Sequence, residues 1–316
     1  MSKRTAWGIL FPGQGSQYVG MGKGLAERYA AAAETFREAD EILELPLSRI
    51  AWEGPEEELI QTKNAQPAIL VHSVAVLRAL AEGAPAAAVA AGHSLGEFSA
   101  HVAQGTLSFP EALRAVRLRG ELMFQAGEAR PGTMAAILGL DDEVVEALCE
   151  EVSQEDSVCV PANLNAPGQV VVSGDLSAVS RARDRAKGEG ARKVIPLTVS
   201  GAFHSPLMKP AEDGLRSFLE GVEFADPKVP VISNVTGRSV RSGSEARELL
   251  IRQLTAPVRW RASVEAMLEQ GAQSFVEVGP GRVLCGLNRR NARGWDCQTL
   301  GEADEVETWL QDGAAH

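Results

Sequence analysis

The sequence is poor in the features that mark several classes of protein. Its 316 residues include only four cysteines and 5% aromatic residues, and the formal net charge is −11. Such an acidic chain lacks the basic surface that binding to nucleic acid requires. The cysteines form no Cys-x-x-Cys pair and have no histidines at metal-ligand spacing. We therefore expect no metal site, and reduced thiols at Cys149, Cys159, Cys285 and Cys297.

Long hydrophobic runs are also missing. The apolar stretch at residues 6–11 is too short for a signal peptide or a membrane span. We interpret it as a first buried strand, and expect a cytoplasmic protein that binds no membrane. With 45% hydrophobic and 23% charged residues, the chain is long enough for one large domain and a smaller one.

Short apolar runs alternate with helical segments in the first part of the chain. The runs at 9–11 and 87–91 are interleaved with Ala-rich helical segments at 26–42, 67–81 and 111–126. This alternation is typical of a parallel sheet covered by helices. The same style returns near the C-terminus, with strands expected at 229–233 and 274–278 and helices at 206–219, 244–254 and 263–270.

The middle of the chain has a different order. It predicts strand, helix, strand, strand, helix and strand at 133–139, 142–152, 158–164, 169–173, 177–187 and 193–199. That order is the ferredoxin-like split β-α-β unit. We therefore predict an α/β fold in which residues 1–127 and 199–316 form a large subdomain with a parallel sheet, and residues 128–198 form a small ferredoxin-like subdomain.

Gly92-His93-Ser94-Leu95-Gly96 is the most informative motif. It stands between an expected strand and an expected helix, which is the context of a G-x-S-x-G nucleophile elbow. Small flanking residues allow the strained backbone that exposes the serine hydroxyl at a helix N-terminus. The alternative is a glycine-rich turn with an incidental serine. The context favours Ser94 as a nucleophile.

His204 is the best candidate for the base that activates Ser94. It lies in a loop of small residues between an expected strand and Pro206, where catalytic groups often collect. A structural histidine is the alternative. The acids between Ser94 and His204 are expected in the small subdomain, so we predict a Ser-His dyad whose imidazole is held by a backbone or amide carbonyl.

Arg119 is expected on an otherwise apolar face of the helix at 111–126. An arginine there is costly unless it is paired. It either extends its head to water or points into a cleft to bind a carboxylate through two hydrogen bonds. The spacing alone does not decide between these two possibilities.

The loop at residues 11–17, Phe-Pro-Gly-Gln-Gly-Ser-Gln, follows the first strand but lacks the lysine and the glycine spacing of nucleotide-binding loops. It is a candidate source of a second backbone donor to an oxyanion. Residues 181–193 contain six cations, which are either a solvated helix face or a docking patch for an acidic protein: Arg181, Arg183, Arg185, Lys187, Arg192 and Lys193.

Together these motifs resemble the malonyl-CoA:acyl carrier protein transacylase family, which includes acyltransferase domains of fatty acid and polyketide synthases. The resemblance extends along the chain, through the motifs at residues 11–17, 92–97, 119–120, 161–169, 201–205, 252–258 and 277–281. It implies an α/β-hydrolase-like core with an inserted ferredoxin-like subdomain. It also implies malonyl transfer in two steps, through a malonyl ester of a serine.

The resemblance assigns roles to individual residues. Ser94 and His204 would be catalytic, and Arg119 would bind the malonyl carboxylate. The backbone N–H groups of Gln14 and Leu95 would form the oxyanion hole. Three further substrate-site residues follow from the same comparison: Gln253, which would position His204 through a carbonyl, Asn163, which would line the cleft, and Phe203, which would favour malonyl over methylmalonyl.

The implied partners are malonyl-CoA and acyl carrier protein, with no cofactor in the chain itself because the carrier brings the phosphopantetheine. We expect a monomeric, discrete enzyme of fatty acid synthesis, with a polyketide pathway as an alternative. Two other possibilities remain from the residues. One is a serine esterase or thioesterase on the same core, and the other is a carrier-docking module in which Ser94 is inert.

Overall fold

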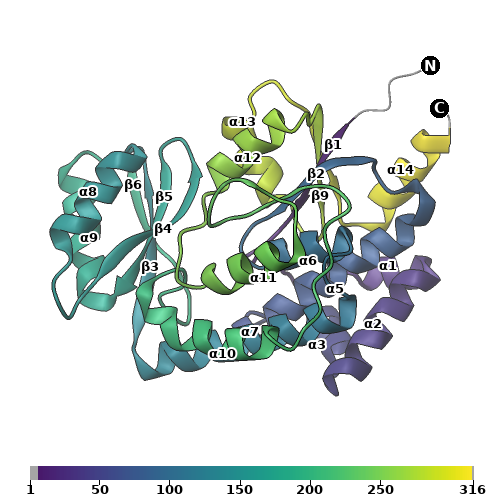
Figure 1. Cartoon of the computed structure of the whole chain (residues 1–316), viewed down its shortest axis with the longest axis horizontal. Helices are drawn as coiled ribbons and strands as arrows, with labels where there is room; N and C mark the ends of the chain where they lie inside the picture. Colours follow the sequence, from purple (N-terminus) through teal and green to yellow (C-terminus); the bar gives the residue numbers. More distant parts are fainter. Residues whose placement is uncertain (1–5, 315–316) are drawn as a thin grey trace.

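The computed structural model describes residues 6–314. Its centre is a six-stranded sheet in the order β10-β9-β1-β2-β7-β8 (Figure 1). Neighbouring strands are parallel except β7 and β8, so the predicted parallel sheet is confirmed. The strands are β1 (Trp7–Phe11), β2 (Ala87–Gly92), β7 (Val231–Ile232), β8 (Ser239–Val240), β9 (Ser274–Val278) and β10 (Cys297–Leu300).

Helices cover both faces of this sheet. Successive side chains of a strand point to opposite faces, so they enter two different cores. Ile9 and Phe11 of β1 belong to the larger core, whereas Leu10 between them packs in the core that contains Trp260. The helices are α1 (Lys23–Arg28), α2 (Ala30–Leu43), α3 (Leu47–Glu53), α4 (Glu56–Leu59), α5 (Thr62–Leu80), α6 (Gly96–Ala103), α7 (Phe109–Ala129), α10 (Lys209–Leu219), α11 (Gly243–Arg252), α12 (Trp260–Glu269), α13 (Val283–Asn291) and α14 (Ala303–Ala314).

Two helices differ from the sequence-based expectation. The segment expected at 26–42 is interrupted at Tyr29, which has an extended backbone between α1 and α2. α5 begins at Thr62, before the expected start, and contains Pro67. A proline leaves the carbonyl four residues earlier without its helical donor. Here that carbonyl, of Lys63, accepts a hydrogen bond of 3.0 Å from Arg117 Nη1 instead.

A second sheet lies to one side of the first (Figure 1). Its four antiparallel strands have the order β4-β5-β3-β6, and two helices pack on one face, as the split β-α-β order predicts. The elements are β3 (Gly132–Leu138), α8 (Asp142–Val152), β4 (Cys159–Ala166), β5 (Gln169–Asp175), α9 (Leu176–Gly188) and β6 (Lys193–Pro196). The α/β class with a small antiparallel subdomain is confirmed, and the exact domain boundaries stay a prediction.

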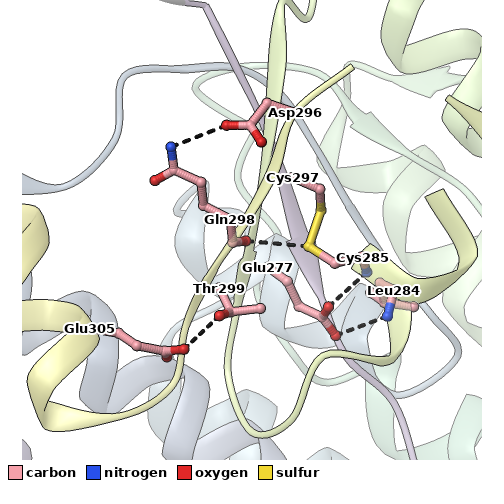
Figure 2. The surroundings of a disulfide bond; sticks show 8 residues. All are labelled: Glu277, Leu284, Cys285, Asp296, Cys297, Gln298, Thr299 and Glu305. Atoms are coloured by element: carbon pink, nitrogen blue, oxygen red, sulfur yellow. Dashed lines mark hydrogen bonds between the residues drawn. A yellow bond between two sulfur atoms is a disulfide. The ribbon is translucent and has the colours of Figure 1, made fainter. Parts of the chain in front are cut away.

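The cysteines correct the expectation of four reduced thiols. Cys285 of α13 and Cys297 of β10 form a disulfide (Figure 2). Cys149 and Cys159 are free and buried between α8 and β4, with their Sγ atoms 3.8 Å apart. The spacing of the cysteines along the chain does not indicate this disulfide, because Cys285 and Cys297 meet only where the chain returns from α13 into β10. Within residues 6–314, no cluster of metal-ligating side chains is present, and no helix is long and apolar enough to cross a membrane.

Candidate active site

Ser94 lies on a tight turn between β2 and α6. Its backbone is in the left-handed region, with φ of 51°. A Cβ on Gly92 would lie 1.9 Å from the Gly96 carbonyl carbon, and a Cβ on Gly96 would lie 2.1 Å from the Phe11 carbonyl oxygen. Both glycines are therefore required by close backbone approach. The turn has the strand–turn–helix geometry that the G-x-S-x-G pattern predicts.

The Ser94 hydroxyl is hydrogen-bonded to His204, with 2.8 Å between Oγ and Nε2. The other ring nitrogen, Nδ1, is 2.9 Å from the Gln253 carbonyl oxygen. Because a carbonyl only accepts, Nδ1 carries the proton and Nε2 is free to accept from Ser94. The imidazole is thus held by a backbone carbonyl, as expected in the absence of a suitable acid.

His204 is buried, and its environment keeps the ring neutral. Burial, with a smaller contribution from the nearby positive charge of Arg119, lowers its pKa to about 3. At neutral pH the ring therefore has an unoccupied Nε2 lone pair facing Ser94. A neutral imidazole in hydrogen-bond contact with a hydroxyl is the arrangement that general-base activation of a serine needs.

The guanidinium of Arg119 lies beside the same hydroxyl. It is only 1% exposed, so its head does not reach solvent. Nη1 donates to Gln66 Oε1 at 2.6 Å, and Nη2 donates to Gln253 Oε1 at 2.9 Å and to Ser94 Oγ at 3.1 Å. Burial lowers its pKa to about 10, which leaves it charged at neutral pH. Within the described chain, every acceptor of Arg119 is uncharged.

One cavity of about 740 Å³ brings most of the candidate residues together. Gln253 lies outside its lining and supports His204 from behind. The cavity is bounded by the elbow, α7, the loop that carries His204 and the edge of the second sheet. The candidate residues in its wall are Gln14, Ser94, Leu95, Arg119, Asn163, Phe203 and His204.

Two backbone N–H groups of the predicted oxyanion hole are free of protein acceptors. Those of Gln14 and Leu95 donate to no atom of residues 6–314, and both residues line the cavity. The N–H of Ser94 itself is occupied, because it donates to Asn234 Oδ1 at 2.7 Å. The elbow therefore offers the N–H of Leu95, rather than that of Ser94, to a bound carbonyl.

Three polar residues of the site were not predicted from sequence. Gln66 accepts from Arg119, Asn234 holds the elbow, and Glu97 accepts from Gln253 Nε2 at 2.6 Å. The only sequence signal was for Glu97, which ends the Gly-His-Ser-Leu-Gly-Glu motif. Neither Gln66 nor Asn234 stands in a pattern that points to Ser94, because folding alone brings them near it.

The chain matches the acyl transferase domain family over residues 9–305. It is 46% identical to the malonyl CoA-acyl carrier protein transacylase of Bacillus subtilis, covering 96% of both chains. Against that of Escherichia coli K12 it is also 46% identical, over 97% of this chain and 99% of the relative. A solved acyl carrier protein S-malonyltransferase of Vibrio cholerae superposes with a TM-score of 0.93 at 43% identity, over 96% of this chain and 99% of that one. The chain therefore belongs to the malonyl CoA-acyl carrier protein transacylases of the acyl transferase family.

Proposed function

We propose that the protein transfers the malonyl group from malonyl-CoA to the phosphopantetheine thiol of acyl carrier protein, through a malonyl ester of Ser94. The observation that carries this proposal is the buried guanidinium of Arg119 beside Ser94, whose acceptors in the described chain are all neutral. A serine and a histidine alone would suit any esterase. A cation in the acyl pocket suits an acyl group that ends in a carboxylate.

In the first half of the reaction, Ser94 Oγ attacks the thioester carbonyl carbon of malonyl-CoA while His204 Nε2 takes the hydroxyl proton. The tetrahedral intermediate then collapses, the C–S bond breaks, and the CoA sulfur takes the proton from His204. The products are malonyl-Ser94 and free CoA. The 2.8 Å contact between Oγ and Nε2 supports this direct proton transfer.

In the second half, the carrier thiol gives its proton to His204 and attacks the ester carbonyl. The C–O bond to Ser94 breaks, and Oγ recovers the proton from His204. The free N–H groups of Gln14 and Leu95 stabilise the oxyanion in both halves, each contributing about 3 kcal/mol, as for other oxyanion donors. No cofactor is needed, because the phosphopantetheine is carried by the partner.

Arg119 fixes the acyl group by exchanging its neutral acceptors for the malonyl carboxylate. Phe203 and Asn163 lie in the cavity wall, where they limit the size of the acyl group. The ring of Phe203 would crowd an α-methyl substituent, although one methyl group is discriminated by only about 10–200-fold in an apolar pocket. We infer a preference for malonyl over methylmalonyl on this basis.

The carrier-docking patch is smaller than the cationic run at residues 181–193. Arg181 donates to the Val152 carbonyl, and Arg185 and Lys187 form ion pairs with nearby acids. Arg192 and Lys193 are exposed and form no ion pair within residues 6–314, so they are the better candidates. Charge reversal at both should raise the KM for carrier protein. An unchanged KM would exclude this patch.

We place the enzyme in fatty acid synthesis, as a cytoplasmic monomer. One similar solved structure is described as a type II polyketide acyl carrier protein in complex with its malonyl-transacylase, at 43% identity and a TM-score of 0.93 over 98% of this chain and 100% of that one. A polyketide carrier is therefore the second candidate acceptor. Transfer to carriers of both kinds, measured side by side, would rank the two pathways.

Intact mass spectrometry tests the proposed reaction. The wild-type protein incubated with malonyl-CoA should gain one malonyl group, and acyl carrier protein should remove it. Ser94→Ala should gain none, whereas Ser108→Ala, which changes a serine at the start of α7, should still be acylated. Discharge to water as fast as to the carrier would instead indicate a thioesterase. Absence of any adduct would indicate a docking module.

A further inference from the structure

Glu97 is a buried acid in the middle of the site to which the proposed reaction assigns no role. It lies in the first turn of α6, and its side chain is 0% exposed. One oxygen, Oε2, accepts from the backbone N–H of Asn234 at 3.1 Å and from Gln253 Nε2 at 2.6 Å. The other oxygen, Oε1, has no hydrogen-bond partner in the described part of the chain. A buried carboxyl group with so few partners is costly to keep ionised.

The contact with Glu97 sets the orientation of the Gln253 amide. Its Nε2 donates to Glu97 Oε2 and to the Ser94 carbonyl oxygen at 3.0 Å, with Asn234 Oδ1 farther away at 3.5 Å. Its Oε1 therefore points the other way, where it accepts from Arg119. The reverse orientation would place an amide N–H₂ against the guanidinium. Glu97 thus acts on Arg119 through Gln253.

Glu97 is also the acid that opposes the charge of Arg119. The two make no direct ion pair, yet Glu97 is the negative charge that raises the pKa of Arg119 against the effect of burial. Ser233 and Asn234, which are neutral, face it from the segment at β7. Four buried histidines lie in and around α6, and burial lowers their pKa, so they are uncharged at neutral pH: His72, His93, His101 and His204.

We propose that Glu97 is a positioning residue that sets how strongly Arg119 prefers an acyl group with a carboxylate. When Glu97 is ionised, it balances the buried cation and weakens the attraction for an incoming carboxylate. When Glu97 is protonated, no buried acid balances the charge of Arg119, and the carboxylate is bound more strongly. The acid in the cavity wall, Glu57, is exposed and screened by solvent. The inference rests on the proposed malonyl transfer.

The two states are both accessible near neutral pH. Burial raises the pKa of Glu97 to about 7, against hydrogen bonds that lower it. The malonyl carboxylate stays ionised at pH 6–8, because an ordinary carboxyl group titrates near 4. Glu97 is therefore mainly ionised at pH 8 and mainly protonated at pH 6. The preference for malonyl should rise as the pH falls.

The experiment compares malonyl-CoA with acetyl-CoA, which lacks the carboxylate. The rate of acyl-enzyme formation is measured for each by intact mass from pH 6 to pH 8. The ratio is the rate with malonyl-CoA divided by the rate with acetyl-CoA. The ratio cancels the titration of His204 and any difference in the amount of active enzyme. For the wild type we expect it to be about fivefold or more higher at pH 6 than at pH 8, a typical size for a coupling between two sites.

Two variants separate charge from hydrogen bonding. Glu97→Gln keeps an oxygen that accepts from Asn234 and Gln253 but removes the charge, so its ratio should be independent of pH and close to the wild-type value at pH 6. Glu97→Ala removes both hydrogen bonds as well, and should also slow acylation by acetyl-CoA. Glu277→Gln is the matched control. Glu277 is buried and has a raised pKa, but its carboxylate accepts from Leu284 and Cys285 at the start of α13 (Figure 2).

The outcomes are distinct. A pH-dependent ratio in the wild type and in Glu277→Gln, with a flat ratio in Glu97→Gln, supports the inference. A flat wild-type ratio overturns it, and needs no variant to fold. A Glu97→Gln ratio that keeps the wild-type pH dependence also overturns it. Failure of the wild type to accept malonyl from malonyl-CoA would instead contradict the proposed function.

Discussion

The parallel and antiparallel sheets contribute to the site in different ways. The parallel sheet ends at the cavity through β2, which leads into the turn with Ser94, and its covering helices bring in Arg119 and support from Gln253. The antiparallel sheet contributes Met134 and Asn163 to the wall of the cavity. Within residues 6–314, it makes no hydrogen bond to Ser94 or Arg119. One sheet supplies the chemistry, and the other shapes the space above it.

This division follows from strand direction. Parallel strands place all their carboxyl ends at one edge, where helix N-termini and loops gather functional groups. An antiparallel sheet has no such edge, and its strands here present the side chains of Met134 and Asn163 to the cavity. One link between the two subdomains beside Ser94 is the 2.8 Å contact of His93 Nε2, in the turn after β2, with Asn165 Oδ1 of β4. Variants on each side can test whether chemistry and shape are separable.

The largest effect is expected at His204, on the side that performs the chemistry. His204→Ala removes the base and should slow acylation of Ser94 by about 10²–10⁴-fold at pH 7, as measured by quenched-flow mass spectrometry. His93→Ala, which removes the contact with Asn165 of the antiparallel sheet, should slow it by less than about tenfold. Equal losses in both variants would mean that the two sheets are not separable.

The next largest effect is expected at Arg119. Arg119→Ala should lower kcat/KM for malonyl-CoA, with a loss of transition-state stabilisation of about 2–5 kcal/mol. This is the range for removing one partner of a buried charge pair. Acetyl transfer should be retained or rise. Arg117→Ala is a control on the same helix, because Arg117 contacts Lys63 and Asn64 instead of Ser94. If Arg119→Ala impairs both acyl groups equally, its role is structural.

A disulfide crosslinks the chain beside the parallel sheet, whereas the two cysteines at the antiparallel sheet are free. Reduction of Cys285–Cys297 opens a loop with a sequence separation of 12. It should lower the free energy of unfolding by about 2–4 kcal/mol, measured by urea titration with and without a dithiol reductant. Cys297→Ser should abolish the response to reductant, and Cys149→Ser should preserve it, since Cys149 and Cys159 are free thiols in the antiparallel sheet region. An unchanged midpoint in the wild type would contradict this expectation.

The smallest effect is expected at Asn163, in the wall that the antiparallel sheet provides. It is largely buried and makes no side-chain hydrogen bond to Ser94 or Arg119 within residues 6–314. Asn163→Ala should therefore leave kcat nearly unchanged and alter the KM for malonyl-CoA only slightly, by the equivalent of about 1 kcal/mol or less in binding free energy. A loss as large as that of Arg119→Ala would show that this wall takes part in the chemistry.

Local patterns predicted the parts of the molecule that are determined locally. The helix expected at 142–152 and the strand expected at 274–278 match α8 and β9. The elbow was equally accessible, because a serine between two glycines after a strand leaves few conformations for the turn. The C-terminal elements α13, β10 and α14 were not predicted, although Ala303, Val306 and Leu310 of α14 recur at helical spacing.

Contacts between distant parts of the chain were not accessible in the same way. Ser94 and Asn234 are separated by 140 residues, and Glu97 and Gln253 by 156. Each pair is brought together by the order of the strands in the parallel sheet. The pairing of Cys285 with Cys297 depends likewise on how α13 returns to β10. The composition of the chain and the spacing of its residues do not indicate such long-range contacts.

The hydrogen bond from Arg119 Nη2 to Ser94 Oγ has a consequence for the resting enzyme. A cation that donates to the serine oxygen withdraws electron density from the nucleophile. A carboxylate that binds Arg119 would draw the guanidinium away and leave the serine oxygen to His204 alone. An acyl-CoA that ends in a carboxylate would thus release the hydroxyl that attacks it, whereas acetyl-CoA, which has no carboxylate, would not. In the resting site Arg119 therefore restrains the Ser94 hydroxyl, and a bound malonyl carboxylate would remove that restraint.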